Sequence, residues 1–511
     1  MISISGGIQM KIKKVLALLL IACMLFALCS CGKKEEKADA HLNVAVSFAY
    51  QALDPHLDYC GWNTSMYGIC ESLFKIDASS TAKPFLLEKA ENDGTKWTLT
   101  LKDGVKFSNG NKLTADMVRR NLLRAAEVNN RFEYLAGFNY EVVDEKTLVV
   151  DTRELLPTLP SDLASPELGM IDLDSTTDFV NNPICTGPFV PVAFTPTGDC
   201  EVKRNENYWG GKVTLEGAKF FYLADDESKL YAMQNGEIDV YNSVSAAARE
   251  VYSQDPDTYK LVTIPATRLQ FYCLNENRLD DSLRRAITLI IDKDNLAEFQ
   301  NGTVSTTDGP FSRNAAYGKV NVPKTDVAAA KELLEKDGYK LNGDGYYEKD
   351  GKVLELKICY YQARQLPTIA TALDDQFRKA GIKTVLQSEE DPDATYVKTG
   401  DFDIALYCMI ADKAGDPYFG LDAMFRQSSK WAIGGFKSDE VETLLDELKV
   451  ETDTAKRAEL ANKIVQLVVD EDAFGFLGLF TKTTVLRKGV SGYAENIPFD
   501  FYGLEATSTK E

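Results

Sequence analysis

LKDGVKFSNG, residues 101–110, and LTADMV, residues 113–118, show the clearest local structure in the chain. Asp-Gly and Asn-Gly are turn dipeptides, so we expect two turns that bracket a short strand around Val105. Thr114 then provides an N-cap, and Met117 and Val118 follow at positions that a helix would bury. The segment predicts a strand and a helix in close succession, joined by tight turns.

Strands and helices alternate along the rest of the chain. Apolar and polar residues alternate at 97–101 and 354–360, which predicts half-buried strands. Apolar residues at helical spacing predict helices at 441–448 and 460–468, the first of them capped by Ser438. This mixture predicts an α/β chain, and 511 residues are enough for two or three domains.

The opening segment also resembles the signature LRDGVKFHDGTPLTAEDV of the peptide/nickel family of ABC importer binding proteins, often called family 5. Further family motifs are matched in the same order at residues 53–56, 71–74, 186–189, 204–210, 234–239, 283–292 and 330–339. The ordered series, from about residue 42 to the C-terminus, carries the resemblance better than any single motif. Two departures are Asn109, where the family usually has an acidic residue, and the absence of a proline after Asn205.

The resemblance implies an α/β, two-lobed periplasmic-binding-protein type II fold with an extra small domain, which makes three discontinuous domains. Lobe I would contain residues 41–83, 185–275 and 480–511, the extra domain residues 84–184, and lobe II residues 276–479. Two crossing segments would form a hinge, and the lobes would close over a ligand. A permease in the membrane would then sense the closed form.

The N-terminal residues predict export and lipid attachment. Three lysines precede an apolar run of about 14 residues, which is too short to span a membrane and typical of a signal. Leu-Cys-Ser-Cys at 28–31 resembles a bacterial lipobox, so we expect a lipoprotein signal peptide at 1–30 and a lipid on Cys31. The alternatives are an uncleaved anchor and an ordinary signal with incidental cysteines. The Lys/Glu-rich residues 31–40 predict a tether that holds the body at the outer face of the cell membrane.

The overall charge excludes one class of partner. The formal net charge is −20 at pH 7, and loss of the lysine-containing signal would make the mature chain more acidic still. This charge argues against binding to nucleic acid and against lying flat on anionic lipid.

Seven cysteines follow Cys31, at positions 60, 70, 185, 200, 273, 359 and 408. They are odd in number and scattered singly, and none belongs to a CxxC pair. The pattern therefore predicts neither a zinc site nor a redox motif. We expect most of them to be small core residues.

An enzyme would need catalytic groups that the sequence does not present. His41 and His56 are the only histidines, neither lies in an HExxH or GxSxG context, and no P-loop motif occurs. Paired carboxylates are always available among 77 acidic residues, so they indicate nothing. We predict a binding protein without catalytic residues or a cofactor. A cell-surface hydrolase and a ligand-sensing protein are the alternatives of another class.

The segment after residue 403 is expected to enter the cleft between the lobes. Residues 411–417 resemble the GDNGDPDNF loop of the peptide-binding branch, in which the first aspartate pairs with the free amino group of the ligand. Asp412 is the nearest match, although this loop is one residue longer before Asp416. The alternative for Asp412 is a solvated loop residue beside Lys413. Tyr407, on the strand before the loop, faces either the cleft or the core.

Trp62, Arg131, Arg268 and Arg364 complete the candidate ligand contacts. Trp62 follows a glycine just after the first strand, where it walls the site or belongs to the core. Arg131 lies where the nickel-binding branch has an arginine that pairs with the carboxylates of a chelator, although surface exposure is the commoner fate of arginine. Arg268 and Arg364 are candidates of the same kind.

These observations predict a monomer that captures short peptides and delivers them to an ABC permease and its ATPase. A nickel–chelator complex is the alternative ligand. Direct metal ligation is not predicted, because nickel prefers nitrogen donors and the late cleft loops contain no histidine.

Overall fold

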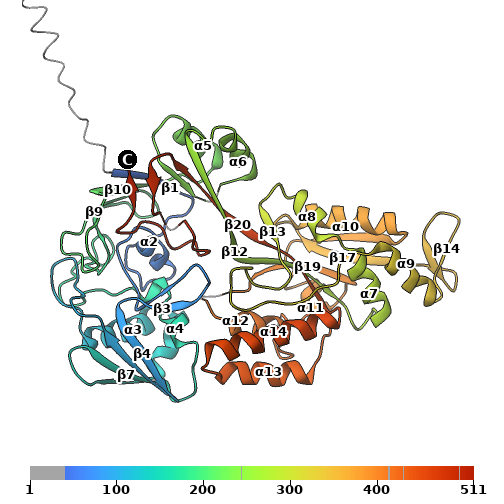
Figure 1. The fold of residues 1–511 in the computed structure, drawn as a ribbon, viewed down its shortest axis with the longest axis horizontal. Coiled ribbons are helices and arrows are strands. Elements are labelled where there is room, and N and C mark those ends of the chain that lie inside the picture. The colour runs from blue at the N-terminus through green and yellow to red at the C-terminus, as the bar shows by residue number, and fades with distance from the viewer. Residues whose placement is uncertain (1–40, 243, 413–414, 430, 494) are drawn as a thin grey trace, which may run out of the picture.

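The computed structural model describes residues 41–511, apart from 243, 413–414, 430 and 494. Its central feature is an 11-stranded mixed sheet with the order β18-β17-β19-β12-β20-β11-β1-β10-β9-β8, in which β13 pairs with β20 beside this path. Figure 1 shows two bodies on either side of the long strands β12 and β20. No helix of the described residues is long and apolar enough to cross a membrane.

We use the name lobe I for the body built on β1 and β8 to β11. Strand β1 lies between β10 and β11 and runs parallel to both, with Val44 opposite Phe220 and Val240. All three side chains are fully buried, as parallel strands covered on both faces require. The elements of lobe I are β1 His41–Val46, α2 Cys60–Met66, β2 Phe74–Ile76, β3 Ala82–Pro84, β8 Phe189–Phe194, β9 Cys200–Arg204, β10 Gly217–Tyr222, α5 Asp226–Gln234, β11 Val240–Asn242, α6 Ala246–Ser253, β21 Val490–Ser491 and β22 Thr509–Lys510.

Strands β12 (Tyr259–Leu274) and β20 (Phe474–Arg487) connect the two bodies. They pair antiparallel over most of their length, with a register shift between Pro265 and Leu269. Before the shift β20 borders β11 of lobe I, and after it β12 borders β19 of the second body. Because proline cannot donate to the ladder, the irregularity falls where the strands bend most easily.

The C-terminal part of β12 belongs to the second body by its packing. Leu269, Phe271 and Cys273 lie in one of its apolar cores, and Tyr272 and Leu274 lie in the other. The strand therefore changes from one body to the other within its own length.

We use the name lobe II for this second body. Its sheet is covered by α7 to α10 on one face and by α12 to α14 on the other, each over its own apolar core (Figure 1). The predicted cap of α13 is confirmed, since the amide of Val441 donates to Ser438 Oγ (3.2 Å). The elements are α7 Asp281–Ile290, α8 Lys293–Glu298, β13 Val304–Thr306, α9 Val327–Lys336, β14 Lys340–Leu341, β15 Tyr347–Lys349, β16 Lys352–Val353, β17 Glu355–Tyr361, α10 Leu366–Ala380, β18 Lys383–Glu389, α11 Tyr396–Thr399, β19 Ile404–Ile410, α12 Tyr418–Phe425, α13 Asp439–Val450 and α14 Thr454–Asp470.

A separate four-stranded sheet with the order β4-β5-β7-β6 forms the small domain below lobe I (Figure 1). Its core also contains Leu73 and Phe74 from the first chain segment and Phe499 and Phe501 from the last, so it is joined to lobe I by packing. Its elements are β4 Leu87–Asp93, β5 Lys96–Leu101, α3 Ala115–Val128, η1 Asn130–Gly137, β6 Asn139–Val142, β7 Thr147–Asp151, α4 Leu159–Asp162 and η2 Pro166–Leu168.

The segment that opened the sequence analysis is partly as predicted. Thr114 Oγ1 accepts from the amide of Met117 (3.2 Å), so the predicted cap of α3 is confirmed. The strand predicted around Val105 is wrong, because the two turns leave room for only an isolated bridge between Lys106 and Lys112. Val105 and Phe107 are nevertheless buried, because their side chains pack into the apolar core of the small domain.

Cys70 and Cys185 form a disulfide with their Cα atoms 5.0 Å apart. The prediction that most of the seven are small core residues is confirmed, because the other five are free and buried: Cys60, Cys200, Cys273, Cys359 and Cys408. The chain enters the small domain after β3 and returns to lobe I at Cys185, near which the amide of Gly187 donates to the carbonyl of Ile69 (2.9 Å). The disulfide therefore closes the base of the small domain.

Candidate functional site

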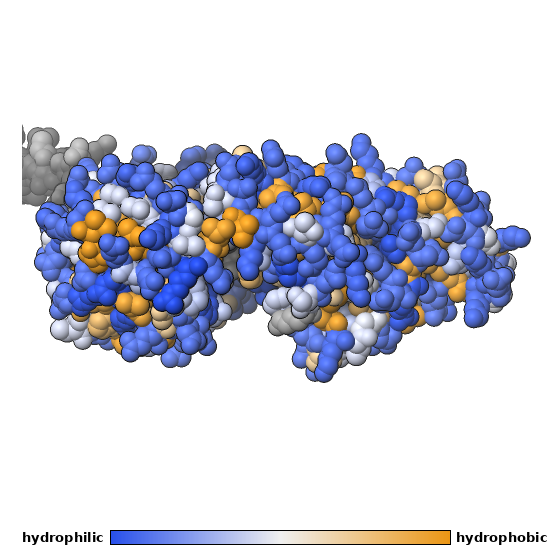
Figure 2. Space-filling view, turned by 90° about the horizontal axis from the view of Figure 1, so that it is seen from below, coloured by the Kyte–Doolittle hydropathy of each residue, from blue (hydrophilic) through white to orange (hydrophobic). Residues whose placement is uncertain are grey.

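A cavity lies between the small domain and lobe II. It has a volume of about 510 Å³, and Figure 2, which views the molecule from below, shows a recess between the two bodies. Arg131 and Asp162 line it from the small domain, and Asp422 and Trp431 line it from lobe II. We call this space the interlobe cavity.

A group of aromatic rings on lobe I, which we call the wall on the side of lobe I, contacts Arg131 of the interlobe cavity through Tyr59. Trp62 belongs to α2 and is half-buried, with ring centroids 5.4 Å from Phe501, 6.3 Å from Tyr59 and 6.3 Å from Phe48. The guanidinium of Arg131 lies 4.1 Å from the centre of the Tyr59 ring, and its Nη1 donates to Glu167 Oε1 (2.7 Å). Tyr59 thus links two of the predicted residues, Trp62 and Arg131.

A second group of aromatic rings, which we call the wall on the side of lobe II, is built around Tyr407. Tyr407 on β19 has ring centroids 5.7 Å from Tyr361 and 6.0 Å from Phe271, and its hydroxyl donates to Asp393 Oδ1 (2.7 Å). Trp431 of the interlobe cavity is a further hydrogen-bond neighbour of the Tyr407 hydroxyl. Tyr407 therefore connects the cavity with the centre of the sheet.

Arg268 and Arg364 lie beside this wall. Burial, and after it the positive charge of Arg364, lowers the pKa of Arg268, and we call these two residues the arginine pair. No carboxylate of the described chain forms an ion pair with either. Arg364 is held by its backbone, because Gln270 Nε2 donates to its carbonyl oxygen (2.8 Å) at a positive φ of 55°.

Asp500 connects the arginine pair with the wall on lobe I. Its carboxylate acts on both Arg268 and the buried Lys482, whose Nζ donates to the carbonyl oxygen of Phe499 (3.0 Å). The next residue, Phe501, is the ring that contacts Trp62. The chain segment Phe-Asp-Phe-Tyr at 499–502 thus brings lobe I and lobe II together at this point.

Asp412 lies apart from the other five predicted residues. Its side chain is 2 % exposed, and its oxygens accept from the hydroxyl of Tyr317 (3.0 Å) and the amide of Gly415 (2.9 Å). Burial raises the pKa of this carboxyl to about 7. The structure thus provides Asp412 with partners from its own chain.

Of the six predicted residues, only Arg131 is among the described residues that line the interlobe cavity. Trp62 and Arg131 belong to one wall, and Tyr407, Arg268 and Arg364 belong to the other. Sequence reasoning missed the residues that link them, Tyr59, Tyr361, Trp431 and Asp500. The aromatic run at 499–502 was a visible signal, because large rings next to an acidic residue near a chain end are unusual on a solvated surface.

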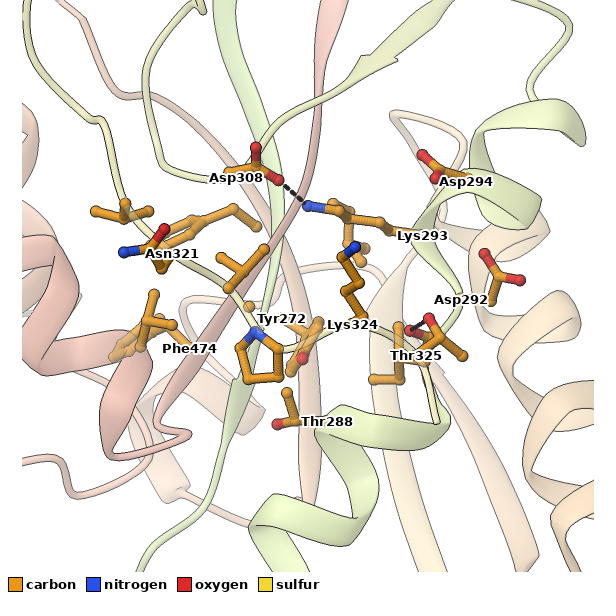
Figure 3. Close-up of a pocket in the computed structure, with 18 of the residues that line it drawn as sticks. Tyr272, Thr288, Asp292, Lys293, Asp294, Asp308, Asn321, Lys324, Thr325 and Phe474 are labelled. Carbon is orange, nitrogen blue, oxygen red and sulfur yellow. Dashed lines mark hydrogen bonds and ion pairs between the residues drawn. The ribbon is translucent and has the colours of Figure 1, made fainter. Parts of the chain in front are cut away.

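A second cavity, of about 610 Å³, is in lobe II and is shown in Figure 3. None of the six predicted residues lines it. Lys293 and Asp308 pair at 2.5 Å on one side of it, and Lys324 extends toward them from the other. Its cationic and acidic side chains are equal in number, so it presents no net charge to a ligand.

The histidines do not form a catalytic or metal site with the residues of the two walls. His56 is fully buried, its Nδ1 lies 2.7 Å from Arg124 Nη1, and its Nε2 lies 3.0 Å from the carbonyl oxygen of Gly169. Burial and the charge of Arg124 lower the pKa of His56 to about 4, so its ring is neutral and donates from Nε2. Within the described residues, no three His, Cys, Asp or Glu side chains are grouped as metal ligands.

The chain is similar to known binding proteins over most of its length. The nickel-binding protein NikA of Staphylococcus aureus is 24 % identical over 405 residues, which cover 78 % of this chain and 81 % of that protein. The oligopeptide-binding protein OppA of Bacillus subtilis is 24 % identical over 513 residues, covering 90 % of this chain and 91 % of that protein.

The chain has the same fold as a relative whose crystal structure is known. The crystal structure of the nickel ABC transporter from Bacillus halodurans superposes with a TM-score of 0.85 at 25 % identity, covering 92 % of this chain and 99 % of that chain. The predicted α/β periplasmic-binding-protein type II fold is thus confirmed. The model of the middle region of family 5 of the bacterial extracellular solute-binding proteins matches residues 81–431. This chain belongs to family 5 of the bacterial extracellular solute-binding proteins.

Proposed function

We propose that this protein captures short peptides between its two lobes, as a monomer, and delivers them to an ABC permease and ATPase. The observation that carries the proposal is the pair Arg268 and Arg364, neither of which forms an ion pair with a carboxylate of the described residues in an otherwise acidic chain. A peptide carboxylate would supply the charge-assisted hydrogen bonds that both guanidinium groups can donate. The relatives named for peptide and nickel binding support an importer role without deciding between the ligands.

The two walls fit an extended peptide in a further respect. Aromatic rings line both sides, with Trp62 and Phe501 on lobe I and Tyr361 and Tyr407 on lobe II. Flat apolar rings accept side chains of many kinds. A peptide would therefore lie with its carboxylate at the arginine pair and its side chains against the rings of the two walls.

A nickel–chelator complex is the second candidate, and the same arginine pair favours it. Chelators of divalent metals carry several carboxylates, which Arg268, Arg364 and Arg131 could hold by charge. Nickel itself would keep the ligands of its chelator, because neither histidine of the chain is placed at the two walls.

Native mass spectrometry decides between the two ligands. We expect protein consisting of residues 39–511, purified without refolding and then denatured, to release a set of short peptides. Release of nickel with an organic chelator and no peptide would contradict the first proposal and support the second. Cleavage of added peptides by the purified protein would instead identify a hydrolase.

We also propose that the protein is anchored to the outer face of the cell membrane by a lipid on Cys31, which lies outside the described residues. The charge, length and small-residue pattern before Cys31 support this reading. We expect mass spectrometry of the mature N-terminal peptide to begin at Cys31 and to show two acyl chains. A Cys31→Ser variant should retain its signal or be released in soluble form. An unmodified N-terminus at another residue would contradict the anchor.

A further inference from the structure

The loop that follows β19 makes a direct contact with a turn of lobe I. Asp412 Oδ2 accepts from the hydroxyl of Tyr317 (3.0 Å), and that hydroxyl also lies 3.4 Å from the carbonyl oxygen of Ser80. The side chain of Ser80 is a further hydrogen-bond neighbour of the Asp412 carboxylate. Tyr317 and Asp412 belong to lobe II and Ser80 to the turn between β2 and β3, so these bonds cross from one lobe to the other.

The contact is closely packed and preformed on the side of lobe I. Gly415 has a φ of +78°, and a Cβ atom there would lie 2.6 Å from the carbonyl oxygen of Ser80. Ser80 is 2 % exposed and Tyr317 is 6 % exposed. Asp77 holds the turn, because its Oδ1 accepts from the amides of Ser79 (2.9 Å) and Thr81 (3.0 Å). A side chain at position 415 would therefore separate the two lobes.

The charged groups around Asp412 do not neutralise it. Asp416, four residues later, raises the pKa of Asp412 further. Arg457 is committed to Asp416, to which its Nη2 donates at 2.6 Å, and to the carbonyl oxygen of Leu448 (2.6 Å). The carboxylate of Asp77 accepts from the amides of its own turn. The hydrogen-bond partners of the Asp412 carboxylate are thus the hydroxyl groups of Tyr317 and Ser80 and the amide of Gly415, all uncharged.

We propose that Asp412, Tyr317 and Ser80 form a closing latch, a set of hydrogen bonds that exists when the lobes are together and breaks when they separate. The proposal rests on the proposed function, since closure over a ligand is the step that the latch controls. It replaces the role predicted for Asp412 from its loop motif, because a carboxylate covered by Ser80 and Tyr317 holds the lobes and leaves the ammonium of a ligand to another group.

The equilibrium between the closed and the open form should depend on pH, and the direction follows from the pKa of Asp412. In the closed form the pKa of Asp412 is about 7, and opening returns the carboxyl to water and to its ordinary pKa near 4. Between these values the closed form binds one proton more than the open form, so closure becomes more favourable as the pH falls through 7. The ratio of closed to open molecules should rise by up to about tenfold per pH unit between 7 and 5. An ammonium anchor would show the opposite sign, because it needs the ionised carboxylate.

Small-angle X-ray scattering of ligand-free residues 39–511 tests the latch without any ligand. We expect a smaller radius of gyration at pH 5.5 than at pH 7.5. Asp412→Asn, which imitates the protonated acid, should be compact at both values. Tyr317→Phe should be more open at both, and Tyr231→Phe, which removes the hydroxyl of an exposed ring on α5, should behave like the unchanged protein. The latch would be overturned if the radius of gyration changed equally with pH in the unchanged protein and in Asp412→Asn. It would also be overturned if Tyr317→Phe had the same radius of gyration as the unchanged protein.

A binding measurement separates the latch from the proposed function. The probe is trialanine, measured by calorimetry at both pH values. If it binds, its affinity should rise at pH 5.5 in the unchanged protein and stay constant in Asp412→Asn, whereas a fall at pH 5.5 would restore the ammonium anchor. If it does not bind at all, the peptide proposal fails while the scattering result still decides the latch. Glu71 and Asp472 titrate near this pH range with partners inside single lobes, and the Asp412→Asn variant controls for both.

Discussion

Replacing Arg268 by alanine is expected to weaken the binding of a released peptide by about 30- to 1000-fold, or about 2–4 kcal/mol. The guanidinium is partly buried beside Arg364, and a ligand carboxylate at this point would be desolvated together with it. Loss of one partner leaves the other charge without compensation, which is why such truncations are costly. Isothermal titration calorimetry with the identified peptide measures the change.

Two comparisons make this result specific. Arg268→Lys should recover part of the affinity, because the charge remains while the two-pronged hydrogen bonding is lost. Arg378→Ala, which removes an exposed arginine on α10 paired with Asp375, should leave the affinity unchanged. A peptide with a C-terminal carboxamide should bind weakly to the unchanged protein and lose little more in Arg268→Ala. Full affinity in Arg268→Ala would remove this residue from the site and, with it, the observation that carries the peptide proposal.

Removal of the disulfide in a Cys70→Ser/Cys185→Ser variant is expected to lower the free energy of unfolding by about 3–5 kcal/mol. The bond closes a loop of 115 residues that contains the whole small domain. Without it, the unfolded chain gains the entropy of a long open loop, while the folded base keeps only hydrogen bonds such as that from Gly187 to Ile69. Urea denaturation followed by circular dichroism measures the loss.

The same experiment has a chemical control. Protein consisting of residues 39–511 has seven cysteines, and five are free in the structure, so denatured but unreduced protein should show five reactive thiols. Seven thiols would contradict the pairing. A reducing agent should destabilise the unchanged protein and leave the double variant as it is. Cys200→Ala, at a buried free cysteine, shows how much a simple loss of core volume costs.

Part of this protein could be predicted because the relevant signals are local. Caps such as Thr114 and Ser438 and the alternating strand at 97–101 depend on neighbours within one turn or one strand, so they are visible in the sequence. The order of the family motifs along the chain also predicted the fold, because it too can be seen in the sequence. The strand around Val105 failed because two turn signals so close together describe a bend, and only the surrounding core decides whether a ladder forms.

Contacts between distant segments could not be predicted. The sequence indicated charged and aromatic candidates, including Trp62, Arg131 and Arg268, because residue type and position in a motif are properties of the chain itself. Only the tertiary structure decided that Cys70 meets Cys185, that Asp500 comes to Arg268, and that Asp412 is covered by Ser80 from the other lobe. Each of these contacts is made by folding two lobes around crossing strands, and its energy depends on burial and on partners that are hundreds of residues away.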